Sequence, residues 1–272
     1  MRTKFERENC VTTIQPYTIN QTMCYYRDKA CLDSGISMLY SFENKNKGYT
    51  VVSDACADIM IYYDKNKEDM GMDLVGPHDH LEYLELREGY TYFGIRFLPG
   101  YSPRIAGAEL MDLKGETVPV YNEGLYKELL EKVREEEKFS EQCSEIMNCL
   151  LGYRETDGKE SGQSILHQSI LDIILCSPQN HSLKELEQYS GYSARYLNKI
   201  FRQRTGYSIM QFSNVLRAQR VCNVLDICKK NQMFPSFDAI AVDLGYSDQS
   251  HMIREFKKYF GMTPKTYYQG HF

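Results

Sequence analysis

The 272-residue chain has no tryptophan, no CxxC pair and no run of about 18 apolar residues. The missing apolar run excludes a transmembrane helix. The nine cysteines are scattered and odd in number, which favours reduced thiols over a disulfide framework or a zinc knuckle. The first residues, MRTKFERENC, are charged where a signal peptide needs an apolar core. We therefore expect a cytoplasmic protein that has no membrane partner and needs no cofactor.

The two halves of the chain differ in charge. Residues 163–272 hold 13 Lys and Arg against 8 Asp and Glu, whereas residues 1–162 hold 19 against 29. A basic half of this kind suits a polyanionic partner. The length is typical of two domains, and the change of charge indicates that the domains differ in role.

The first half reads as strands followed by helices. The segments 49–63 and 81–100 are rich in β-branched and aromatic residues and are separated by turn residues. They predict a small antiparallel sandwich or barrel over residues 1–120. Apolar residues at helical spacing then predict a helical segment at 121–152. The polar stretch YRETDGKESGQ at 153–163 predicts the interdomain linker.

The second half, 164–272, is predicted to be entirely helical and contains an internal echo. The stretch GYSARYLNKIFRQRTGYS begins at Gly191, and GYSDQSHMIREFKKYFGMTP begins at Gly245. Each copy reads as a short helix, a turn that contains glycine, and a second helix with an inward Phe. This is the plan of a helix-turn-helix unit, whose second helix enters a DNA major groove. The alternative is a helical bundle whose polar faces meet only water.

Side chains with paired donors cluster on the outer faces of the two second helices. Arg, Lys, Asn and Gln match the donor and acceptor pattern of base edges, and nearby cations suit phosphates. We predict base-facing roles for Arg195, Asn198, Lys199, Gln249, Ser250, His251 and Arg254, and phosphate contacts for Arg202 and Lys257.

The stretches SLKELEQYSGYSARYLNKIFRQRTGYSIMQF and SFDAIAVDLGYSDQSHMIREFKKYFGMTPKTYY resemble the paired helix-turn-helix signature of AraC/XylS-type transcription regulators. The resemblance covers residues 164–270. It implies an α+β chain in which a cupin-like β-barrel or sandwich with dimerisation helices precedes an all-α domain with two helix-turn-helix units. It also implies double-stranded DNA, RNA polymerase, a small-molecule effector and a second copy of the chain as partners. VVSDACADIMIYY and YFGIRFLPGYSPRI are similar, more loosely, to one type of N-terminal domain in such regulators.

The acidic half holds candidate effector-binding residues. We single out Asp54, Cys56, Asp58, Tyr62 and Arg96. Cys56 is either a redox switch or a buried inert thiol. The absence of a basic neighbour that would lower its pKa favours the inert thiol. Arg96 either holds an anionic ligand or pairs with Asp58. The tyrosines of the predicted sheet either line a pocket or pack in the core; they are Tyr62, Tyr63, Tyr83, Tyr90 and Tyr92.

His78, His80 and Glu85 form a candidate metal site in GPHDHLEYLELREG. Two imidazoles flanking one residue on a strand point to the same face and, with a carboxylate, can bind a metal. The alternative is an ordinary polar turn.

Taken together, these patterns predict a sequence-specific DNA-binding transcription regulator controlled by a small molecule, rather than an enzyme. Three alternatives stay open, namely a metal-dependent cupin enzyme fused to a DNA-binding domain, a regulator controlled by a protein partner, and a regulator with no effector at all.

Overall fold

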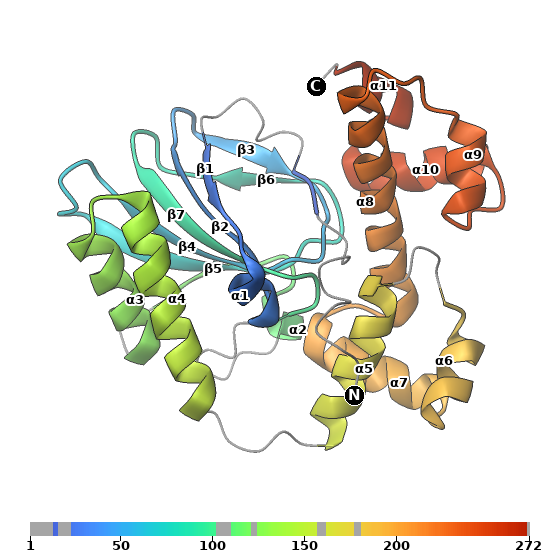
Figure 1. The fold of residues 1–272 in the computed structure, drawn as a ribbon, viewed down its shortest axis with the longest axis horizontal. Helices are drawn as coiled ribbons and strands as arrows, with labels where there is room; N and C mark the ends of the chain where they lie inside the picture. The colour runs from blue at the N-terminus through green and yellow to red at the C-terminus, as the bar shows by residue number, and fades with distance from the viewer. Residues whose placement is uncertain are drawn as a thin grey trace.

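The computed structural model describes residues 13–15, 23–101, 110–120, 124–156, 162–176 and 181–270. Within these ranges the N-terminal domain contains strands, two short helices and a helical hairpin (Figure 1). Its elements are β1 (Met23–Tyr26), α1 (Lys29–Asp33), β2 (Ile36–Glu43), β3 (Gly48–Val51), β4 (Asp58–Tyr63), β5 (Met70–Val75), β6 (Glu82–Glu85), β7 (Thr91–Phe97), α2 (Leu110–Leu113), β8 (Thr117–Pro119), α3 (Gly124–Glu135) and α4 (Phe139–Thr156).

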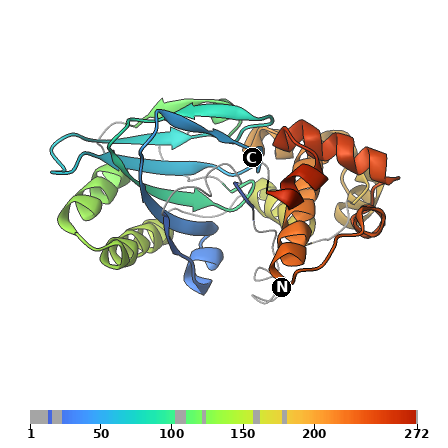
Figure 2. The same ribbon diagram turned by 90° about the horizontal axis from the view of Figure 1, so that it is seen from above.

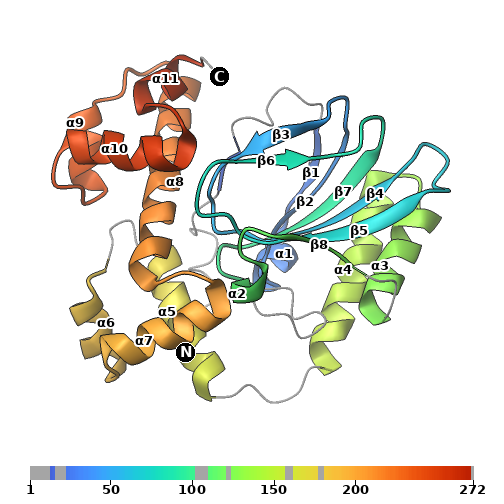
Figure 3. The same ribbon diagram turned by 180° about the vertical axis from the view of Figure 1, so that it is seen from behind.

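The strands form two sheets that face each other. Six strands pair in the order β1-β2-β7-β4-β5-β8, and β3 pairs with β6. Successive side chains of a strand point to opposite faces. Ile59 and Phe93 therefore pack toward the α3–α4 hairpin, whereas Tyr40 and Met60 pack toward the β3–β6 pair. The domain has three layers, with the six-stranded sheet in the middle (Figure 3). The predicted α+β chain with an N-terminal β-sandwich is confirmed.

The second domain is built from seven helices within the described residues. They are α5 (Gly162–Cys176), α6 (Leu183–Ser190), α7 (Ala194–Thr205), α8 (Ile209–Lys230), α9 (Phe237–Asp243), α10 (Gln249–Phe260) and α11 (Pro264–Gln269). Helix α4 runs into the first four residues of the segment predicted as linker, and α5 begins at its tenth residue. Residues 157–161 of that segment lie outside the described residues.

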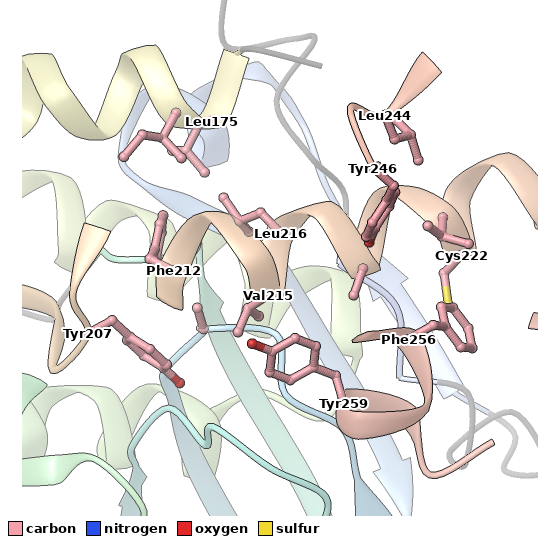
Figure 4. Close-up of a cluster of buried hydrophobic side chains, with 14 of the residues drawn as sticks. Leu175, Tyr207, Phe212, Val215, Leu216, Cys222, Leu244, Tyr246, Phe256 and Tyr259 are labelled. Atoms are coloured by element: carbon pink, nitrogen blue, oxygen red, sulfur yellow. The ribbon is translucent and has the colours of Figure 1, made fainter. Parts of the chain in front are cut away.

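The long helix α8 is the core element of the second domain. Its side chains Phe212, Val215, Leu216 and Cys222 are buried, and Figure 4 shows residues of the surrounding helices gathered around it. Tyr207, before α8, packs at one end, and Phe256 of α10 packs farther along. Because all these side chains belong to one buried cluster, the helix pairs α6–α7 and α9–α10 are both held at fixed positions on α8.

The two domains also share that core. Val52 and Ala55, from the loop between β3 and β4, belong to the same buried cluster as α5 and α8. The sheet layer and the helical domain lie side by side (Figure 2). Among the described residues, no helix combines the length and the apolar character needed to cross a membrane.

Candidate nucleic-acid interface and candidate ligand pocket

The helix pairs α6–α7 and α9–α10 have second helices that begin and end in the same way. Ser193 caps α7 by accepting a hydrogen bond from the N–H of Tyr196, and Asp248 caps α10 in the same way from His251. Each of these helices has 12 residues and ends at a glycine in the left-handed conformation, at φ 76° and 71°. Such caps satisfy backbone groups that a helix end leaves free. The sequence echo therefore corresponds to a structural repeat.

The repeat places exposed polar side chains at matching positions. Arg195, Lys199 and Arg202 are exposed on α7. Their spacing of four and then three residues puts them on one face of the helix. On α10 the positions 55 residues later are Ser250, Arg254 and Lys257, and these are exposed too. Six of the nine residues predicted to contact DNA thus form two equivalent faces, one on each helix.

Asn198 does not belong to the exposed face, and its geometry argues against the predicted base-reading role. Its side chain is half-buried. Nδ2 donates to the carbonyl oxygen of Ala194 at 3.0 Å, and Oδ1 accepts from the N–H of Ile209 at 3.0 Å. The amide thus bonds one residue of its own helix and the first residue of α8, so Asn198 stabilises the junction between the two helices.

Gln249 and His251 are half-exposed beside the second face. The imidazole Nδ1 of His251 lies 3.1 Å from Ser247 Oγ, its Nε2 lies 3.9 Å from Glu255 Oε2, and its ring meets Tyr246 edge-on. These contacts hold the His251 ring close to its own domain.

A buried ion pair fixes the second helix pair to α8. Arg217 donates from Nε and Nη2 to the two carboxylate oxygens of Glu255, at 3.0 and 2.7 Å. Both side chains are 8% exposed, and Arg217 also lies over the ring of Tyr246. Helix α8 has 22 residues and is therefore about 33 Å long. This is close to the roughly 34 Å between successive major-groove segments on one face of B-DNA.

The N-terminal domain contains a cavity of about 270 Å³ between its two sheets. The six-stranded sheet, the opposite strand pair and three loop segments line it. The sheet contributes Met23, Tyr25, Met38, Tyr40, Asp58, Met60, Val75 and Arg96, and the pair contributes Tyr49, Val51 and Leu84. The loop after β5 contributes Gly76 and His78, and the segments before β1 and β4 contribute Thr13, Ile14, Gln15, Val52, Asp54 and Cys56. The ring of Tyr40 lies where a Cβ on Gly94 would be, so the glycine is what lets the tyrosine lie across the sheet.

Four of the five predicted effector-binding residues meet at this cavity. Asp54, Cys56, Asp58 and Arg96 all line it. Arg96 pairs with both aspartates, at 2.9 Å to Asp54 and 3.0 Å to Asp58. Tyr62 does not line the cavity. It packs against Tyr90 and Tyr92.

The other tyrosines singled out in the sequence are also absent from the cavity wall. Tyr25, Tyr40 and Tyr49 line it in place of Tyr63, Tyr83, Tyr90 and Tyr92. The first three belong to β1, β2 and β3, and the sequence pattern did not distinguish them.

Cys56 is a fully buried free thiol. Burial raises its pKa well above the usual value, and the Asp54 carboxylate adds to this effect. The inert-thiol interpretation therefore fits the geometry. The expectation that no basic group lies near it is wrong, because Arg96 lies close enough to oppose this rise in pKa.

The candidate metal residues are not brought together. His78 is buried with Nδ1 2.6 Å from Glu82 Oε2, whereas the His80 side chain is 64% exposed and bonds Asp79. Glu85 pairs across the strands with Gly48 and is exposed. Nowhere in the described part of the chain do three His, Cys, Asp or Glu side chains form a group that could hold a metal ion. This geometry favours the polar-turn interpretation.

The helix-turn-helix architecture agrees with the sequence comparisons. Residues 186–270 match a family described as a helix-turn-helix domain. The multiple antibiotic resistance protein MarA of Escherichia coli K12 is 30% identical over 112 residues, which is 40% of this chain and 83% of MarA. The chain belongs to the AraC/XylS family of transcriptional regulators.

Other members of the AraC/XylS family match over a smaller share of their length. The regulator RipA of Corynebacterium glutamicum is 31% identical over 104 residues, 38% of this chain and 30% of RipA. The F1 operon positive regulatory protein of Yersinia pestis is 37% identical over 79 residues, 29% of this chain and 25% of that protein. The matched part therefore spans less than a third of these two relatives.

The N-terminal domain of this AraC/XylS chain matches a different family. Residues 27–119 match a family described as a domain of unknown function (DUF6597). Among solved structures, ToxT from Vibrio cholerae aligns over 85% of this chain and 96% of ToxT, with a TM-score of 0.41 and 12% identity. A likeness this distant supports no argument about ligands.

Proposed function

We propose that this chain is a sequence-specific DNA-binding transcription regulator whose DNA affinity is set by a small molecule in the N-terminal cavity. The observation that carries the DNA-binding part is the pair of equivalent exposed faces. Arg195, Lys199 and Arg202 on α7 repeat as Ser250, Arg254 and Lys257 on α10. Two such faces, on α7 and α10 and both packed on the rigid helix α8, suit two neighbouring major-groove segments.

The loop 52–57 supports the proposed coupling between cavity and DNA. Asp54 and Cys56 of this loop line the cavity, while Ala55 between them packs into the core that surrounds α8. Ala55 has a φ of 58°, an uncommon backbone conformation for a residue with a side chain. A ligand that shifts Asp54 therefore also shifts the contact of Ala55 with the helix-turn-helix domain.

Hydrogen bonds from α8, and from Tyr207 just before it, to this part of the N-terminal domain add a second connection. Gln219 bonds the backbone of Ser53 and of Ile14, and Tyr207 donates to the carbonyl oxygen of His78 at 2.7 Å. Ile14 and His78 line the cavity. An effector that favours one arrangement of these contacts shifts the population of domain arrangements and hence the affinity for DNA.

The remaining parts of the proposal concern assembly and place of action. The α3–α4 hairpin supplies the contacts of a homodimer, and the dimer acts in the cytoplasm on promoter DNA together with RNA polymerase. The chain carries out regulation by binding and has no catalytic role of its own.

The test is a binding-site selection with the full-length protein on random duplexes. We expect enrichment of a motif with two conserved blocks separated by about one helical turn, 10–10.5 base pairs. Competition with scrambled duplexes then measures the ratio of specific to non-specific affinity. Failure to enrich any motif, with a folded protein that binds random DNA equally, contradicts the proposal.

A further inference from the structure

The polar end of the cavity has more negative than positive charge. Asp54 and Asp58 are 4% exposed, and their ion-pair partner among the described residues is the single guanidinium of Arg96. Their other hydrogen bonds come from neutral donors, such as Tyr40 to Asp58 and Gln15 to Asp54. Each of the three guanidinium nitrogens already donates to an aspartate. Nε and Nη2 bond Asp58 at 3.0 Å, and Nη1 bonds Asp54 at 2.9 Å. An anionic ligand therefore meets a pocket with a surplus carboxylate and an arginine whose charge is already shared between two aspartates.

At this end the two carboxylates and His78 retain acceptor capacity, beside the second N–H of each of the Arg96 Nη1 and Nη2 atoms. Within the described residues, Asp58 Oδ2 accepts one hydrogen bond and Asp54 Oδ1 accepts one, and a carboxylate oxygen can accept two. The Nε2 atom of His78 is buried and has no hydrogen-bond partner there. In the neutral ring, Nδ1–H donates to the Glu82 carboxylate at 2.6 Å and Nε2 is left as an acceptor.

The charge of this group of side chains is negative in either protonation state of His78. If the ring is neutral, Glu82 adds a second negative charge. If the ring is protonated, the charges of His78 and Glu82 cancel and the surplus of Asp54 and Asp58 over Arg96 remains. A buried charge surplus is costly unless a partner neutralises it.

The rest of the cavity is lined by aromatic rings and thioethers. Tyr40 and Tyr49 line it beside Met38 and Met60, with Tyr25 exposed and lining it from β1. Burial raises the pKa of the Tyr40 and Tyr49 phenols, so the rings are neutral. Neutral aromatic rings attract cations through their faces, and thioethers adapt to apolar groups of irregular shape.

We propose that the cavity binds an organic cation, an ammonium group attached to a small apolar body, with the ammonium directed at Asp54, Asp58 and His78. The volume of about 270 Å³ is at the lower end of ligand pockets, so the body is about the size of one ring or a short alkyl chain. This inference rests on the proposed function of the cavity as the effector site.

The test compares ligands that differ only in charge. Tyramine, tyrosol and 4-hydroxyphenylacetate share one aromatic body and end in an ammonium, a hydroxyl and a carboxylate. Hexylamine, hexanol and hexanoate do the same on an alkyl chain. Calorimetric titration of the full-length protein is expected to give an amine Kd about tenfold or more below that of the matched carboxylate. A carboxylate that binds as tightly as its amine overturns the proposal.

Substitutions locate the effect in the cavity. Asp54→Asn removes the surplus charge while keeping an oxygen for the N–H of Cys56, and it is expected to abolish most of the preference for amines. Glu82→Gln tests the same point on a half-exposed side chain and is expected to weaken amine binding several-fold. Glu82 and Glu85 lie on the same strand and both are outside the cavity lining, but Glu82 bonds His78, which lines it. Glu85→Gln, at an exposed position, is therefore the matched control and is expected to bind amines like the parent.

The two proposals fail in different ways. If no amine binds at millimolar concentration while the protein still binds its selected DNA site, the cation proposal is wrong and the DNA-binding function stands. If amines bind with the expected selectivity but no DNA sequence is preferred, the cavity assignment stands and the regulator function is wrong. An unchanged amine preference in both Asp54→Asn and Glu82→Gln also overturns the cation proposal.

Discussion

Gln219 of α8 donates from Nε2 to the carbonyl oxygen of Ser53 at 3.0 Å, across 166 residues of sequence. Its Oε1 accepts from the N–H of Ile14 at 2.8 Å. The residue is completely buried. One side chain of the helix-turn-helix domain thus holds two backbone segments next to the cavity, and it is the most direct connection between them and α8.

We predict that Gln219→Leu loosens this connection. Leucine keeps most of the volume but leaves the carbonyl of Ser53 and the N–H of Ile14 without the amide, and each buried unsatisfied group costs about 1–3 kcal/mol. We expect the free energy of unfolding to fall by at least that amount and amide exchange in residues 52–57 to accelerate. Urea denaturation and hydrogen-exchange mass spectrometry measure the two effects. Gln203→Leu, at an exposed position of α7, is the control, and unchanged exchange in 52–57 contradicts the assigned role.

A second prediction separates Asn198 from Arg195. Asn198→Ala removes one hydrogen bond within α7 and one that joins α7 to α8, at about 0.5–1.5 kcal/mol each, so we expect lower stability with the ratio of specific to non-specific DNA affinity unchanged. Arg195→Ala, on the exposed face, is expected to weaken DNA binding with stability preserved. Chemical denaturation and gel-shift titration distinguish the two. Reversed results mean that the recognition face of α7 is wrongly assigned.

A third prediction concerns base reading against phosphate contact on α10. Arg254→Ala should cost about 1–3 kcal/mol on the selected site and relax the preferred sequence, whereas Lys257→Ala should weaken all duplexes roughly equally and lower the slope of log affinity against log salt. Both side chains are exposed, so neither change should unfold the protein. Equal effects of both variants on specific and random duplexes contradict the assignment.

A fourth prediction follows from the pKa of Asp79. Hydrogen bonds from Lys114, which has the larger effect, and from His80 lower the pKa of Asp79 from 3.8 to about 2. Because the folded pKa is the lower one, the ionised carboxylate stabilises the fold above its unfolded pKa, and this contribution is lost as the pH falls from about 4 to about 2. The stability difference between the parent and Asp79→Asn, measured by urea denaturation, should therefore shrink between neutral pH and about pH 3. A difference that stays constant or grows in acid contradicts this.

The ion pair of Lys114 and Asp79 also connects the two domains. Lys114 Nζ lies 2.7 Å from Asp79 Oδ2 and 4.3 Å from the ring centroid of Tyr207, which precedes α8. The ammonium is thus shared between a carboxylate and an aromatic face. Loosening it in acid is expected to act first on the contact between the two domains.

The helical half was predictable from the sequence because its signals are local. Ser182 and Glu185 form a capping box, Gly191 ends α6 in the left-handed conformation, and Thr263 with Pro264 opens α11. Each of these depends on residues three or four positions apart. The role of Asn198 was missed, although its position three residues before the buried Phe201 places it toward the apolar side of α7 rather than on the exposed side.

The cavity was only partly predictable because it depends on long-range pairing. The register that puts Asp58 opposite Arg96 joins residues 38 positions apart, and no local pattern specifies it. Tyr40 lines the cavity from β2, in a region where no strand was predicted. Tyr62 and Tyr92 lie opposite each other farther along the same two strands, where they pack together and do not reach the cavity.

Hydroxyl-radical footprinting of the full-length protein on its selected duplex tests the central claim most directly. If α7 and α10 enter neighbouring major-groove segments, protection falls in two blocks on one face of the DNA, with centres about 10–10.5 base pairs apart. Arg195→Ala should then weaken one block and Arg254→Ala the other. A single protected block, or two blocks that both variants weaken equally, contradicts the assignment of α7 and α10 as two separate recognition helices.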